Sequence, residues 1–189
     1  MDMETLGTSE RAIILTIGVL CVPDNYEQDD PKELYNLGKL YHLNPIEQEK
    51  VYNRTMNFST IQWWSTQNPD VFKEQMNCEN AMNLHRAVDD ILHYLSKNGL
   101  FNRDEKNIIW SRGLFEVKLW EGLIKDLKYK DSIMFWQWRD SRTACDVLCG
   151  DPNGKIKELP GLNKHDPLSD CILDYFRLKK LGCFKKWSY

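Results

Sequence analysis

The pattern of hydrophobic positions predicts strands in the first part of the chain and alternating helices and strands in the rest. Residues 12–22 form an apolar run rich in β-branched side chains, which is typical of a buried strand, and an acidic loop follows it. A second strand is predicted at 33–42. Helices are predicted to begin near Pro45 and at Ser59 or Thr60, and the second of them buries an isoleucine and a tryptophan.

The later segments predict a mixed β-sheet with helices packed on it. The clearest helix covers 79–95, where apolar residues recur at steps of three and four, and Asn98-Gly99 ends it. We then expect strands at 108–111 and 133–138, helices at 115–127 and 141–148, a turn at 151–154, and a helix that begins at Pro167 with Asp166 as its cap. This order predicts an α/β fold, in one domain that spans residues 1–189.

The composition fits a protein that buries its own core and has no strongly basic surface. The chain has 189 residues, 42% of them hydrophobic, and a net charge of −3. Such a charge excludes the broad positive field of a nonspecific duplex binder, so any nucleic-acid contact should be local. The six cysteines follow neither a disulfide nor a zinc spacing, and we expect free thiols. We expect no membrane span and no signal peptide.

Two compact clusters of charged residues carry the candidate chemistry. Asp2 and Glu4 point to one face if their segment is extended. His165 stands on the loop before the last predicted helix, and Asp170 stands inside that helix. Three carboxylates and a histidine are the residues of a two-metal phosphodiesterase site, in which oxygen ligands favour Mg²⁺ or Mn²⁺. A histidine with a reference pKa of ~6.5 suits the role of general base.

These residues resemble the motifs of the DEDDh-type 3′→5′ exonucleases, which belong to the DnaQ-like superfamily and have an RNase H-like fold. The resemblance is strongest to the DexA (exonuclease A) family of T-even bacteriophages. Asp-x-Glu followed by Thr5-Leu6-Gly7 resembles the first motif, and His-x-x-x-x-Asp at 165–170 has the spacing of the third. Segments 59–69, 110–113 and 135–143 resemble the intervening segments in the same order. The similarity therefore spans nearly the whole chain.

The resemblance implies hydrolysis of single-stranded nucleic acid, DNA in the first place, from its 3′ end to nucleoside 5′-monophosphates. It implies that Asp2 bridges two Mg²⁺ or Mn²⁺ ions, that Glu4 and Asp170 are further ligands, and that His165 is the general base. Glu116 stands where the family has its middle aspartate, and it is a candidate fourth ligand. A phage origin and a cytoplasmic location, in the host cell, are also implied. No homo-oligomer is predicted.

Contacts to the substrate are expected from the first motif and from one arginine. The resemblance implies that Glu4 and the backbone of Thr5, Leu6 and Gly7 meet the terminal 3′-hydroxyl. Arg112 is a candidate for a phosphate contact, although a structural salt bridge explains it equally well. The basic pairs Lys179-Lys180 and Lys185-Lys186 favour a solvated tail over a nucleic-acid contact.

Two departures from the family pattern keep other functions open. The family's first motif closes a longer apolar strand, whereas here Asp2 follows Met1 directly, so a short first strand is expected. Glu116 is also longer than an aspartate by one methylene. A degenerate member that binds nucleic-acid ends or a protein partner without cleavage, and an interaction module that borrows the fold, are the alternatives. Core packing is favoured for Trp63-Trp64, Trp136 and Trp138, and a solvated position for Asp174.

Overall fold

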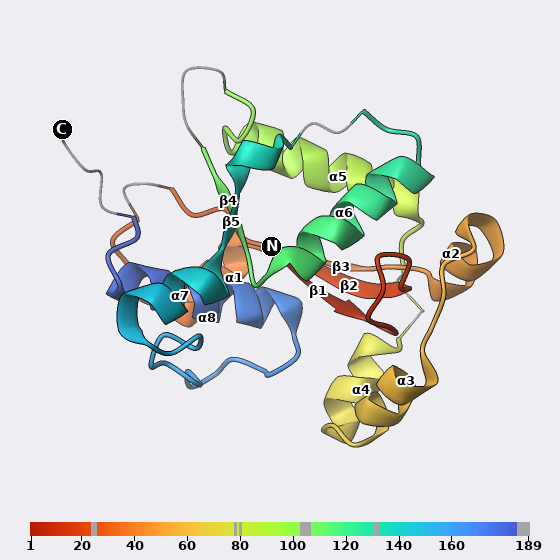
Figure 1. The fold of residues 1–189 in the computed structure, drawn as a ribbon, viewed down its shortest axis with the longest axis horizontal. Helices are drawn as coiled ribbons and strands as arrows, with labels where there is room; N and C mark the ends of the chain where they lie inside the picture. Colours follow the sequence, from red (N-terminus) through yellow and green to blue (C-terminus); the bar gives the residue numbers. More distant parts are fainter. Residues whose placement is uncertain (24–25, 78, 80, 103–106, 131–132, 185–189) are drawn as a thin grey trace.

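A three-stranded antiparallel sheet stands at the centre of the fold (Figure 1). The computed structural model describes residues 1–189 except 24–25, 78, 80, 103–106, 131–132 and 185–189. The sheet has the order β1-β2-β3, and a parallel pair joins β4 to β5. The strands are β1 (Asp2–Thr5), β2 (Ile14–Val19), β3 (Lys39–His42), β4 (Ile109–Ser111) and β5 (Trp138–Asp140). The Met1 nitrogen donates to the Trp110 carbonyl oxygen over 2.8 Å, which sets the start of β1 beside β4.

Helices surround these strands, and several begin with the same local signal. An Asn or Asp side chain accepts a hydrogen bond from a backbone N–H of the first turn, which would otherwise have no partner within the helix. A proline follows this residue, and its fixed φ is already that of a helical residue. Helices α1, α2, α4 and α8 all begin in this way. The helices are α1 (Pro31–Leu37), α2 (Pro45–Tyr52), α3 (Phe58–Ser65), α4 (Pro69–Gln75), α5 (Leu84–Lys97), α6 (Leu114–Asp126), α7 (Ser141–Cys149) and α8 (Pro167–Lys180).

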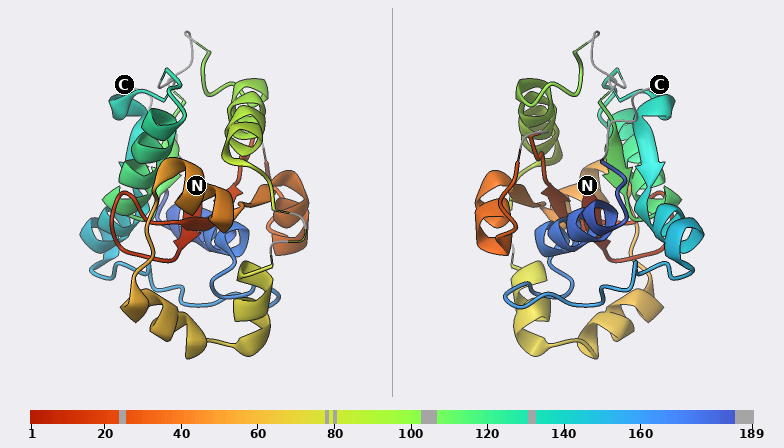
Figure 2. Two further views of the ribbon diagram at one scale, coloured as in Figure 1. Left: turned by 90° about the vertical axis from the view of Figure 1, so that its right-hand side faces the viewer. Right: turned by 90° about the vertical axis from the view of Figure 1, so that its left-hand side faces the viewer.

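Every residue of β2 is buried, because helices cover both faces of the sheet. On one face, Ile17 and Val19 belong to a core that includes Val88 and Ile91 of α5 and Leu119 of α6. On the other face, α8 lies against β2 and β1 and carries a second apolar cluster with α1. In both views of Figure 2, α5 lies at one end of the molecule and α3 and α4 lie at the other.

Gly18 allows α8 to approach the sheet closely. A Cβ atom added to Gly18 would lie 2.4 Å from the carbonyl carbon of Pro167, so only a glycine leaves room for the first turn of α8. Gly18 pairs with Asp2 across the two strands, and residues that pair in this way share one face. The glycine therefore brings the start of α8 onto the face that carries the Asp2 carboxylate.

The observed architecture confirms the predicted fold class, a mixed α/β fold of RNase H-like type. The structure also confirms several local predictions: β2 within 12–22, α2 at Pro45, β4 within 108–111, α6, α7, the turn at 151–154, and α8 with Asp166 as its cap. Within the described ranges, no helix combines the length and the apolar character needed to cross a membrane.

Four local predictions were wrong. The strand predicted at 33–42 is helix α1 followed by the short β3, because Asp30 caps a helix that Pro31 begins. The segment 133–138 holds a 3-10 turn (Phe135–Gln137) that leaves Phe135 exposed, and β5 starts only afterwards. Helix α5 begins at Leu84, after its cap Asn83, and not at 79. The cap of α3 is Asn57 and not Ser59 or Thr60.

Candidate active site

Strand β1 brings two carboxylates to one face of the sheet. Asp2 and Glu4 lie two residues apart in the strand, so their side chains point to the same face. They pair with Gly18 and Thr16 of β2. Asp2 is buried, with an exposed fraction of 8%, while Glu4 is half-buried. The prediction that both carboxylates point to one site is therefore consistent with the strand geometry.

Helix α8 and the turn before it supply the second cluster. Asp166 caps α8 by accepting the Ser169 N–H over 2.6 Å, which fixes His165 just outside the helix and Asp170 in its first turn. The His165 Nδ1 atom lies 3.7 Å from Glu4 Oε1. One ligand atom from each of Glu4, His165 and Asp170 lies within 4.8 Å of the others. Two sequence segments more than 150 residues apart thus meet in one site.

Helix α6 contributes a fourth carboxylate. Its first turn follows Gly113, whose φ of +148° is a conformation that side chains rarely adopt. Glu116 stands in this first turn with an exposed fraction of 7%. Among the described residues, none donates a hydrogen bond to its buried Oε2 atom. A buried carboxylate oxygen without a donor calls for a cation or a proton.

Burial raises the pKa of all four carboxyl groups in this site, and repulsion from the neighbouring carboxylates adds to the effect for Asp2 and Glu4. Burial is the main cause for Asp2, and the charges of Asp170, Glu4 and Glu116 add to it. Burial followed by the charges of Asp170 and Glu116 raises the pKa of Glu4. Burial raises the pKa of Asp170 to about 6 and also raises that of Glu116. These four residues are hereafter called the carboxylate cluster. Without a nearby cation, their ionised forms are less stable than those of free carboxylic acids in water.

The residues present fit divalent metal ions. A cluster of carboxylate oxygens is the ligand set that hard cations such as Mg²⁺ and Mn²⁺ prefer. A bound cation would satisfy the Glu116 oxygen that lacks a donor among the described residues, and it would offset the negative charges that raise the pKa of Asp2 and Glu4. Burial lowers the pKa of His165, against the opposing effect of Asp170, so its imidazole is neutral near neutral pH.

A cavity of about 350 Å³ lies next to the carboxylate cluster. Glu4 belongs both to its wall and to the cluster. The cavity is lined by Glu4, Thr5, Gly7, Thr8, Ser59, Thr60, Trp63 and Phe115. Trp63 has an exposed fraction of 42%, whereas its neighbour Trp64 is fully buried. The prediction of core packing therefore holds for Trp64 and is wrong for Trp63.

The residues predicted to bind substrate fall into three environments. Thr5 and Gly7 line the cavity. Leu6 packs in a core cluster with Ile13, Leu15 and Trp64. The Arg112 guanidinium is engaged with protein groups: Nη1 lies 2.6 Å from Asp174 Oδ1, and Nη2 donates to Asn153 Oδ1 over 2.7 Å. The phosphate contact of Arg112 stays a prediction.

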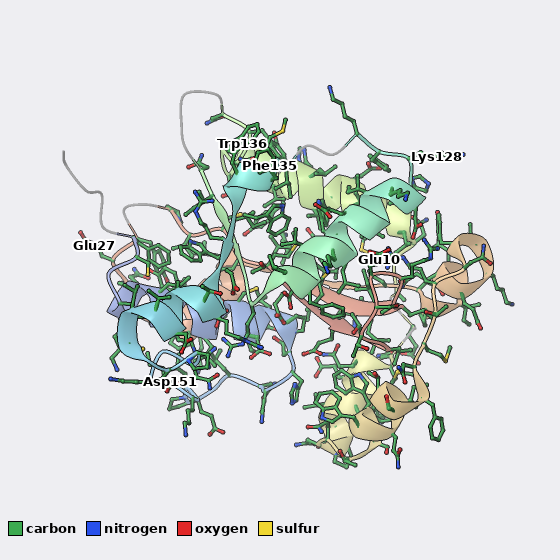
Figure 3. The ribbon with its side chains drawn as sticks, viewed as in Figure 1. Glu10, Glu27, Lys128, Phe135, Trp136 and Asp151 are labelled. Atoms are coloured by element: carbon green, nitrogen blue, oxygen red, sulfur yellow. The ribbon has the colours of Figure 1, made fainter. Side chains whose placement is uncertain are left out.

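Several predictions concerned residues outside the site. Asp174 was expected in a solvated position, which is wrong: it is buried and also binds Arg177 and the Ser141 hydroxyl. Trp136 is exposed and not in the core, at the end of the molecule far from α3 (Figure 3). Lys185 and Lys186 lie outside the described residues, as does Cys78. The other five cysteines are free thiols.

Sequence reasoning missed one buried polar residue that contacts the site. Gln75, at the end of α4, donates through Nε2 to the carbonyl oxygen of His165 over 3.1 Å. No helix was predicted at 69–75, and the partner of Gln75 stands 90 residues further along the chain. The Asn68-Pro69 pair, a cap followed by proline, was the available signal for α4.

Comparison of the sequence with known proteins assigns the chain to a family of exonucleases. The model of the 3'-5' exoribonuclease Rv2179c-like domain matches residues 1–175. The chain belongs to this exonuclease family. It is also 26% identical, over 203 residues, to the exodeoxyribonuclease of Enterobacteria phage T4, a match that covers 95% of this chain and 86% of that protein. The Rv2179c-like family and the phage relative together confirm the resemblance to DnaQ-like exonucleases, and they support nuclease activity on nucleic acid.

Proposed function

We propose that this protein is a metal-dependent 3′→5′ exonuclease that hydrolyses single-stranded DNA to nucleoside 5′-monophosphates. The observation that carries the proposal is the meeting of Glu4, His165 and Asp170, whose ligand atoms lie within 4.8 Å of one another. Asp2 and Glu116, both buried, complete the carboxylate cluster around them. The DNA substrate follows the exodeoxyribonuclease of phage T4, the relative that matches 95% of this chain.

The carboxylate cluster would hold two divalent cations. Asp2 is buried and its pKa responds to Asp170, Glu4 and Glu116, which supports it as the ligand shared by both ions. Glu4, Glu116 and Asp170 would each bind one ion, directly or through water. When bound, the two ions supply positive charge for the attacking and the leaving oxygen. The extra methylene of Glu116 is accommodated in this scheme because its carboxylate is buried at the N-terminus of α6.

His165 would act as the general base. Burial lowers the pKa of its imidazole, so the ring is neutral near pH 7 and can accept a proton from the attacking water. The rings of Trp63 and Trp64 pack against it edge to face, at centroid distances of 5.0 Å and 5.9 Å. These contacts restrict the orientation of the imidazole, which favours proton transfer in one direction.

The cavity beside Glu4 would hold the nucleotide at the 3′ end. Its volume of about 350 Å³ is at the small end of ligand sites, which suits one nucleotide better than a duplex. Trp63 and Phe115 offer aromatic surface to a base, and Thr5 and Gly7 offer polar backbone near Glu4. Recognition of a single unpaired nucleotide would confine the enzyme to single-stranded ends.

The proposal is tested with a 5′-labelled single-stranded DNA oligonucleotide and its RNA counterpart, in Mg²⁺, Mn²⁺ or EDTA. We expect a ladder that shortens from the 3′ end, on DNA, only with metal. Asp170→Asn should abolish it, whereas Asp146→Asn, an exposed carboxylate of α7, should leave it unchanged. A ladder on RNA alone would favour the ribonuclease activity named in the family description. End binding without any ladder would identify a non-cleaving member and overturn the proposal.

A further inference from the structure

Gln75 connects the candidate general base to the strand pair that carries Glu4. Its side chain is buried, with an exposed fraction of 3%. Nε2 donates to the His165 carbonyl oxygen over 3.1 Å, and Oε1 accepts the Thr16 hydroxyl over 2.5 Å. Thr16 itself pairs with Glu4 across β1 and β2. A continuous set of contacts therefore runs from Glu4 through Thr16 and Gln75 to His165.

The backbone of His165 needs such support. Its φ is +64°, in the left-handed region that costs free energy for residues with a side chain and that persists only where surrounding contacts hold it. The direction of the side chain and of the carbonyl group both depend on this conformation. A donor fixed on the His165 carbonyl oxygen therefore also fixes where the imidazole points.

We propose that Gln75 is a positioning residue, which holds the turn at His165 so that the imidazole stays over the carboxylate cluster. This inference rests on the proposed function, because it assigns His165 to the reaction. Gln75 reaches the backbone of His165 only and does not touch the ring in any contact that the structure describes. Its effect on catalysis is thus exerted through His165. The loss of a supporting contact of this kind costs about 10- to 100-fold in activity.

Gln48 provides a matched control within the same protein. It is a second fully buried glutamine, and it also binds β2: Nε2 donates to the Ile14 carbonyl oxygen over 2.7 Å, and Oε1 accepts the Ile14 N–H over 2.9 Å. Gln48 belongs to α2 and makes no described contact with His165. Replacing either glutamine with methionine keeps the volume and removes its hydrogen bonds to β2, but only one replacement releases His165.

The test measures kcat and KM of the full-length chain with single-stranded oligonucleotide and Mn²⁺. Gln75→Met should lower kcat about 10- to 100-fold, with KM and Mn²⁺ affinity unchanged. Gln48→Met should keep the wild-type kcat at a comparable loss of thermal stability. In a His165→Ala background, Gln75→Met should cause no further fall in kcat, because the residue it positions is absent. A further fall there, or an unchanged kcat in Gln75→Met alone, would overturn the inference while the exonuclease assignment stands.

A readout that does not depend on activity separates this inference from the proposed function. The ring ¹H–¹³C signals of His165, assigned by their loss in His165→Ala, should broaden or split in Gln75→Met and stay sharp in Gln48→Met. Thr16→Val serves if Gln75→Met fails to fold: it releases only one end of Gln75, and it should broaden the same signals to a smaller extent. Unchanged His165 signals in these variants would refute positioning by Gln75, whether or not the wild-type protein cleaves DNA.

Discussion

Gly18 and Pro167 touch backbone to backbone, with only 2.4 Å between the Pro167 carbonyl carbon and the place where a Cβ atom of Gly18 would stand. The contact presses the first turn of α8 onto β2, directly opposite Asp2. It therefore sets how far Asp170, three residues after Pro167 in the same turn, lies from the carboxylates of β1. The packing of one glycine thus determines whether the two halves of the candidate site can meet.

Replacing Gly18 should damage stability and activity together. In Gly18→Ala, the methyl group forces α8 away from the sheet, and we expect a loss of about 3 kcal/mol in the free energy of unfolding, measured with urea. Gly150→Ala is the control, because its methyl group meets nothing within 4 Å and its φ of +67° adds only about 1 kcal/mol of strain. Equal losses in the two variants would refute the tight approach of α8.

The carboxylate cluster should make stability depend on pH and on metal. The pKa of Asp170 rises from 3.8 to about 6 on folding, so protonation stabilises the folded, metal-free protein. This contribution is complete below the unfolded value of 3.8 and is lost as pH rises through about 6. The melting temperature in EDTA should therefore fall between about pH 4 and about pH 6, and Mn²⁺ should raise it more at the higher pH. Asp170→Asn should flatten the dependence, and Asp146→Asn should not.

Trp63 should contribute to binding of the substrate end. Its ring lines the cavity and is 42% exposed, so an unpaired base can stack on it. Because stacking on an aromatic ring contributes about 1–3 kcal/mol per base, Trp63→Ala should weaken oligonucleotide binding about tenfold or more. Fluorescence anisotropy in a non-cleaving Asp170→Asn background measures it. Trp136→Ala, at an exposed tryptophan far from α3, should leave the affinity unchanged (Figure 3).

Arg112 should act on stability more than on substrate affinity. Its guanidinium binds Asp174 and Asn153, which connects the segment between β4 and α6 to α8 and to the turn after α7. Arg112→Gln breaks a partly buried ion pair, and we expect a loss of about 3 kcal/mol in the free energy of unfolding with KM little changed. Arg86→Gln, at an exposed arginine of α5, is the control for charge. A large rise in KM at unchanged stability would instead support the phosphate contact.

Local signals in the sequence were enough to predict the half of the site that α8 carries. Asp166 followed by Pro167 is typical of a helix start, because the carboxylate accepts a backbone N–H of the first turn and the proline has the φ of a helical residue. The same signal at Asp30-Pro31 was available, yet the apolar residues around Leu34 favoured a strand. That error arose because the leucine packs against α8, a partner more than 130 residues away.

Contacts between distant segments explain what the sequence did not predict. Asp174 has the spacing of a solvated helical residue, and only the fold shows that Arg112, Ser141 and Arg177 enclose it. Gln75 has no neighbour in sequence that indicates its role, since both its partners come from other elements. The sequence did not show that Trp63 is exposed while Trp64 is buried, because the two tryptophans are adjacent and have the same local sequence pattern.

Mn²⁺ binding is the most direct test of the claim that Asp2, Glu4, Glu116 and Asp170 form one two-metal site. Isothermal titration of the metal-free wild-type protein should give a stoichiometry of about two ions per chain. Asp2→Asn, which removes the proposed shared ligand, should lose at least one of them while the protein remains folded. No Mn²⁺ binding by the wild-type protein, or the same stoichiometry and affinity in Asp2→Asn, would contradict the account.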